Sequence, residues 1–124
     1  MNQAVLSVLI AGFLPYVCTV IAKWGIKNYD NHQPRACLAQ LDGFRARANA
    51  AQLNSFEAFP FFAAAVALAL YTQVPMVQVL QCAWFFIAMR VIYIYCYVAD
   101  YATLRSIVWL LGLAAVVRIF ILAL

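Results

Sequence analysis

The sequence predicts an all-α integral membrane protein built as a bundle of four membrane-spanning helices. Of the 124 residues, 69% are hydrophobic and only 10% are charged, whereas soluble domains carry about 25% charged residues. The mean hydropathy is +0.92. So few charges cannot keep this much apolar surface dispersed in water, which excludes a water-soluble globule. The long apolar runs do not alternate with polar residues, which excludes a β-barrel.

The chain length fits a single membrane-embedded domain, residues 1–124, with about four spans of ~20 residues and short connections. We expect the spans at residues 4–22, 48–72, 75–98 and 104–123. The first run ends at Lys23 and Trp24, a basic residue beside an aromatic residue of the kind found at membrane interfaces. It shows no signal-peptide cleavage pattern, so we expect it to be retained.

The polar breaks separate the later spans. Residues 23–47 form the only strongly polar stretch and are expected to be a solvated loop that runs into a helix start. Pro75 suits the first turn of the third span. The third polar break, residues 100–103, precedes the fourth span. Because the last two connections are short, the helices that they join should be antiparallel neighbours.

The charge distribution predicts the topology. The first and third loops carry most of the Lys and Arg residues, and the second loop carries none. By the positive-inside rule those two loops face the cytoplasm and both termini lie on the opposite side. The pI near 9.0 then reflects topology and attraction to anionic lipids rather than nucleic-acid binding. The short loops and the uncleaved first span fit a bacterial inner membrane or an endoplasmic-reticulum membrane equally well, and the brevity of the chain favours the bacterial one.

No metal site is expected. The four cysteines show no C-x-x-C spacing, and His32 is the only histidine. The cysteines are interpreted as small buried hydrophobic residues.

Ionisable residues within the spans point to an interior or a site, because a charge at membrane depth costs at least ~2.5 kcal/mol. Glu57 is such a residue in the second span. At ~100° per residue, Arg47 and Asn54 point within ~20° of each other, and Glu57 is displaced from Asn54 by about 60°. The three side chains therefore line one helix face.

The third span carries a matching polar face. Arg90, Tyr93 and Tyr97 follow i, i+3, i+7 spacing and fall within ~60° of one another. An ion pair between Glu57 and Arg90 across an interior or a subunit seam is the simplest way to satisfy both stripes. The pair either only holds the helices of the bundle together or also forms part of a site.

A cationic rim is expected where these spans meet the cytoplasmic face. Its members are Arg45, Arg47, Arg105, Tyr93, Tyr97 and Asp100. Such a rim suits an anionic amphiphile or a small acid, because guanidinium groups bind carboxylates through two parallel hydrogen bonds. The alternative is a basic rim that contacts lipid phosphates.

At these residues the chain resembles the MAPEG family, the membrane-associated proteins in eicosanoid and glutathione metabolism, which includes microsomal glutathione transferases and leukotriene C4 synthase. Residues 47–60, RANAAQLNSFEAFP, are similar to the family's N-x-x-E followed shortly by proline. Residues 90–97, RVIYIYCY, are similar to its R-x-x-Y-x-x-x-Y, and Arg105 matches an arginine that opens the last span. The resemblance covers nearly the whole chain.

The resemblance implies a homotrimer that holds glutathione at each subunit seam near the cytoplasmic face. The implied glutathione contacts are Arg47, Asn54, Glu57, Arg90, Tyr93 and Tyr97, with Arg105 as the catalytic residue. A free thiol has a pKa of ~8.5, and an adjacent guanidinium lowers it, so Arg105 would stabilise the thiolate. The thiolate would then attack a hydrophobic electrophile that arrives through the bilayer.

Three functions follow as hypotheses. The first is a glutathione-dependent transferase or peroxidase that conjugates or reduces hydrophobic electrophiles at subunit interfaces. The second is a non-catalytic MAPEG-like protein that binds lipid or a thiol conjugate, which is favoured by Ala50 at a position where the family often has arginine. The third is a small multidrug-type transporter, in which Glu57 would couple proton and cation exchange.

Overall fold

The computed structural model describes all 124 residues and contains only helices and connecting segments. The helices are α1 (Asn2–Lys23), α2 (Pro34–Ala39), α3 (Gly43–Tyr71), α4 (Met76–Val98) and α5 (Ala102–Ala123). All except α2 are long and apolar enough to cross a membrane. This confirms the predicted all-α class and a bundle of four membrane-spanning helices.

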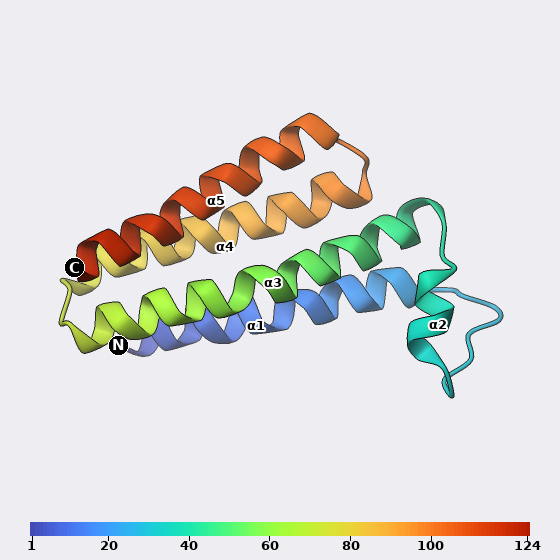
Figure 1. Cartoon of the computed structure of the whole chain (residues 1–124), viewed down its shortest axis with the longest axis horizontal. Helices are drawn as coiled ribbons and strands as arrows, with labels where there is room; N and C mark the ends of the chain where they lie inside the picture. Colours follow the sequence, from blue (N-terminus) through green and yellow to red (C-terminus); the bar gives the residue numbers. More distant parts are fainter.

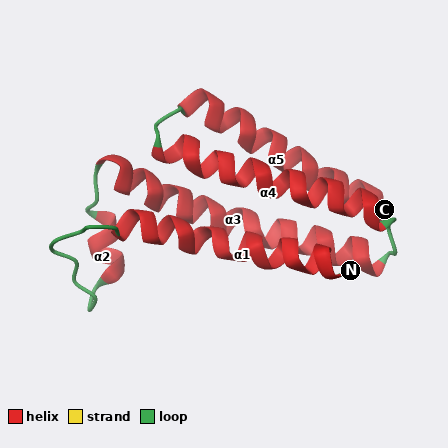
Figure 2. Cartoon of the chain, turned by 180° about the vertical axis from the view of Figure 1, so that it is seen from behind, coloured by secondary structure: helices red, strands yellow, loops and turns green.

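The four long helices form two antiparallel pairs, α1 with α3 and α4 with α5 (Figure 1). The pairs lie close together at the end where both termini and the α3–α4 turn are found. They diverge toward the opposite end, where α2 and the α4–α5 turn lie (Figure 1, and from behind in Figure 2). The first and third loops therefore share one end of the bundle.

The two tight turns are built in the same way. After α3, the Val74 amide donates to the Ala69 carbonyl at 2.9 Å; after α4, the Tyr101 amide donates to the Cys96 carbonyl at 2.8 Å. Gln73 and Asp100 take the left-handed conformation, with φ of 58° and 67°. These are Schellman motifs, in which a left-handed residue turns the chain back and its neighbours satisfy the last helix carbonyls. Each turn thereby makes the two helices that it joins antiparallel neighbours.

The main core lies where the two pairs converge. The rings of Phe62 and Phe86 stack at 4.2 Å between α3 and α4, and Phe62 is fully buried. Small residues surround them, including the fully buried Ala4, Ala65 and Ala69. Small side chains let helices approach closely, and close packing is a main driving force for helix association in lipid.

The first loop differs from the expectation of a simple solvated segment, because it contains the short helix α2. Pro34 is its first residue, a position where the missing amide hydrogen costs nothing. The next helix begins at Gly43, whose φ of 55° suits glycine. Arg45 donates through Nη2 to the Trp24 carbonyl at 2.8 Å and so ties the start of α3 to the end of α1.

We expect Phe62→Ala to lower the free energy of unfolding by about 3 kcal/mol, because it leaves a cavity in the core against Phe86. Unfolding in detergent micelles or bicelles, followed by circular dichroism, measures this. Phe13→Ala is the matched control, because Phe13 is 58% exposed on the outer face of α1 and should lose less than about 1 kcal/mol. Equal losses in the two variants would contradict the core described here.

Candidate functional site

A groove runs between α3 and α5, with α4 behind it, and consists of two adjoining hollows. The hollow nearer the diverging end has a volume of about 410 Å³ and carries Tyr93, Tyr97, Arg105 and Ser106. The deeper one has a volume of about 200 Å³ and is mostly apolar. Its lining is Asn54, Glu57, Ala58, Phe61, Phe86, Arg90, Trp109, Leu113 and Val116. Asn54 and Trp109 line both hollows, so the groove is polar at one end and apolar at the other.

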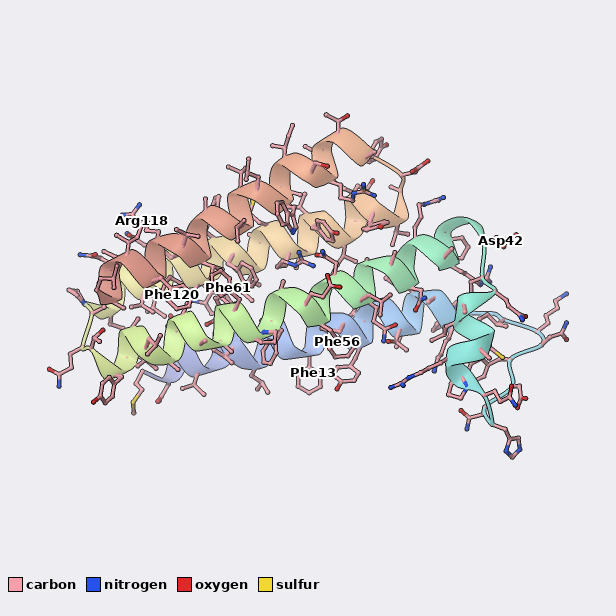
Figure 3. The ribbon with its side chains drawn as sticks, in the orientation of Figure 1. Phe13, Asp42, Phe56, Phe61, Arg118 and Phe120 are labelled. Atoms are coloured by element: carbon pink, nitrogen blue, oxygen red, sulfur yellow. The ribbon has the colours of Figure 1, made fainter.

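The apolar hollow is closed off toward the terminal end of the bundle by aromatic contact. Phe61 of α3 and Phe120 of α5 stack with ring centres 4.8 Å apart. Figure 3 shows the two side chains meeting between these helices. Past this contact, core residues of the two pairs pack against each other.

Arg90 is the buried charge of the site, with only 4% of its surface exposed. Its Nη1 donates to Asn54 Oδ1 at 2.9 Å, and its Nη2 donates to Ser55 Oγ at 2.9 Å. The predicted ion pair with Glu57 is therefore wrong within one subunit. Asn54 and Ser55 lie on the α3 face that meets α4, whereas Glu57 is exposed at the edge of the groove.

Arg47 is also engaged within the subunit. Its Nε and Nη2 both donate to the Val98 carbonyl at 3.1 Å. The Schellman turn satisfies the carbonyls of Cys96 and Tyr97 but leaves that of Val98 for this arginine. Arg47 therefore joins the start of α3 to the end of α4 and does not line either hollow.

The polar hollow is organised by stacking of cations on aromatic rings. The Arg105 guanidinium lies 4.3 Å from the centre of the Tyr97 ring, and Tyr97 meets Tyr93 edge to face at 5.6 Å. The Arg90 guanidinium in turn lies 4.2 Å from the centre of the Tyr93 ring. This chain of four side chains holds both arginines in place, and the Arg105 side chain has no hydrogen-bond partner within the chain.

The structure thus brings together six of the seven residues that the sequence singled out, namely Asn54, Glu57, Arg90, Tyr93, Tyr97 and Arg105. Arg47 is turned away. Of the three arginines expected in a cationic rim, only Arg105 lines a hollow, because Arg45 is turned to the Trp24 carbonyl and Arg47 to that of Val98.

Sequence reasoning missed Ser55, Ser106 and Trp109. Trp109 follows Arg105 by four residues and therefore shares its helix face, a signal that was present in the sequence. Ser55 is a neighbour of Asn54 in sequence but points about 100° away. Only the packing of α4 against α3 shows that both face Arg90.

Four apolar helices around an interior groove with buried arginine define a multi-pass integral membrane protein. Residues 4–124 match the model of the MAPEG family, so the chain belongs to the MAPEG family. This confirms the resemblance seen in the sequence, and the family includes glutathione transferases and peroxidases. Comparisons with curated proteins and with solved structures find no match.

We expect Ser55→Ala to lower the free energy of unfolding by about 1–2 kcal/mol, because one donor of the buried Arg90 guanidinium loses its acceptor. Thermal unfolding in detergent measures the loss. Ser106→Ala is the matched control, since its exposed hydroxyl donates only to the Ala102 carbonyl of its own helix. An unchanged Ser55→Ala protein would show that this hydrogen bond contributes nothing to stability.

Proposed function

We propose that this protein is a glutathione-dependent transferase or peroxidase that acts on hydrophobic electrophiles within the membrane. The observation that carries the proposal is the two-part groove, in which a cationic, hydroxyl-rich hollow adjoins an apolar one. Glutathione is a charged tripeptide, and a hydrophobic electrophile comes from lipid. A site for both needs these two environments side by side.

Arg105 is the proposed catalytic residue. Its guanidinium is held against Tyr97 and keeps its donors free, and it lies in the first turn of α5. A helix N-terminus and a guanidinium both favour an anion. They would stabilise the thiolate of glutathione as its proton leaves to water. In conjugation the sulfur forms a bond to the electrophilic carbon, whose electron pair moves to the oxygen or leaving group.

Asn54, Glu57, Tyr93 and Tyr97 are the proposed contacts for the rest of glutathione. Asn54 and the two hydroxyl groups offer hydrogen bonds, and the Glu57 carboxylate suits an ammonium group. Arg90 and Arg47 have a different proposed part. Arg90 acts through Asn54, which it holds by a hydrogen bond. Arg47 fixes the end of α4 through the Val98 carbonyl, so both are proposed as positioning residues.

We also propose that three copies assemble with the groove at each seam. Glu57 is exposed at membrane depth and has no cationic partner in its own subunit, a costly arrangement if lipid covers it. A neighbouring copy or bound glutathione would shield it. The mass of the intact complex, measured by native mass spectrometry in detergent, tests the number of copies.

Glutathione titration tests the proposed activity. We expect saturable heat of binding and thiolate absorbance near the ultraviolet edge in the wild type. Arg105→Ala should lose the thiolate signal and bind roughly tenfold or more weakly, because a charge-assisted hydrogen bond is removed. Glu57→Gln should weaken binding while keeping the thiolate signal.

Arg35→Ala is the matched control, since Arg35 is an exposed arginine of α2 outside the groove and should behave as the wild type. No binding at millimolar glutathione would overturn the proposal. Binding without a thiolate signal would instead favour the non-catalytic alternative, in which the engaged arginines and Ala50 leave a site that only binds.

The proposed topology places the first and third loops in the cytoplasm. Cys18 and Cys96 are fully buried and Cys82 is 7% exposed, whereas Cys37 of α2 is partly exposed at the loop end. We expect a membrane-impermeant maleimide to label Cys37 in inside-out vesicles and not in intact cells. Cys37→Ser should abolish the labelling. Labelling of intact cells would reverse the proposed orientation.

A further inference from the structure

A second groove lies on the outer face of the α4–α5 pair, away from the site described above. It has a volume of about 370 Å³, with Phe85, Leu111 and Ala114 among its apolar residues. Its polar groups come from Gln81 of α4 and Arg118 of α5. Figure 3 shows Arg118 pointing outward from α5, away from the α1–α3 pair.

Arg118 has no partner within the chain. The other arginines of the long helices are all engaged. Hydrogen bonds hold Arg45, Arg47 and Arg90, and Arg105 stacks on Tyr97. Arg118 is exposed and makes neither a hydrogen bond nor an ion pair. At 1.5 Å per residue it lies about 7.5 Å inside the end of α5, from where its long side chain reaches the headgroup level of one leaflet.

No acidic side chain of a second copy in the same orientation lies at the level of Arg118. The chain has four acidic residues, and three of them, Asp30, Asp42 and Asp100, lie at the opposite end of the bundle with the first and third loops. Glu57 lies roughly 21 Å from the end of α3, far deeper than Arg118. The phosphates of lipid headgroups do lie at the level that the Arg118 side chain reaches, so a headgroup has the right charge and depth to meet it.

We infer that this groove binds an anionic phospholipid, with Arg118 and Gln81 on its phosphate and an acyl chain along Phe85 and Leu111. A guanidinium binds two phosphate oxygens at once, and the Gln81 amide supplies a further donor. The apolar lining and the position at the membrane edge commit the site to a lipid rather than to a free anion. The inference is independent of the proposed glutathione chemistry.

Quenching of tryptophan fluorescence by brominated lipids measures lipid binding at this groove. Trp84 is one turn along α4 from Gln81, so a Trp24→Phe, Trp109→Phe background leaves a single reporter beside the groove. The protein is reconstituted with brominated phosphatidylglycerol or with brominated phosphatidylcholine of the same chains. We expect the anionic lipid to bind at least about fivefold more tightly, the factor that corresponds to about 1 kcal/mol per arginine.

The variants decide the role of Arg118. Arg118→Gln should reduce the preference for the anionic lipid to about one. Arg118→Met, whose apolar side chain suits the membrane, should do the same and replaces Arg118→Gln if that variant does not fold. Arg118→Lys keeps the charge and should keep part of the preference. Arg35→Gln removes an exposed charge at the other end and should change nothing. A preference that persists without Arg118, that is absent in the starting protein, or that millimolar inorganic phosphate abolishes would overturn the inference.

Discussion

The structure depends on how one buried guanidinium is satisfied in a medium without water. Arg90 lies in the interior, and a charged group there needs partners that lipid does not offer. Asn54 and Ser55 supply them from α3, and the Tyr93 ring covers one side. These contacts fix the face that α3 turns toward α4. They also place Asn54 in the groove, where it borders both hollows.

The groove itself follows from the divergence of the two helix pairs. Near the termini, aromatic rings and small residues fill the space between α3 and the α4–α5 pair, with Phe62 on Phe86 and Phe61 on Phe120. Toward the other end the pairs separate, and Arg47 spans the distance by holding the last free carbonyl of α4. The groove therefore lies where the two pairs separate, and Arg47 connects them at its open end.

Much of this could be predicted from the sequence. Apolar runs separated by polar breaks predicted four helices, and helical spacing predicted that Arg90, Tyr93 and Tyr97 share one face. The partner of Arg90 could not be predicted in this way. Periodicity says which residues of one helix point together, but the rotation of α3 against α4 decides whether Ser55 or Glu57 meets the arginine. The hydrogen bonds of Arg45 and Arg47 likewise depend on backbone carbonyls at the ends of other helices. The pattern of side chains in the sequence does not indicate which carbonyls these are.

The division into two helix pairs also bears on how the protein enters the membrane. Synthesis proceeds from the N-terminus, so α1 and α3 are made before α4 and α5. Both acceptors of Arg90, Asn54 and Ser55, belong to α3 of the first pair, whereas Arg90, the donor, belongs to α4 of the second. When the arginine reaches the bilayer, Asn54 and Ser55 have already been made. The order of the helices along the chain thus supplies the arginine with partners at the moment of insertion, when an isolated charge in lipid would be most costly.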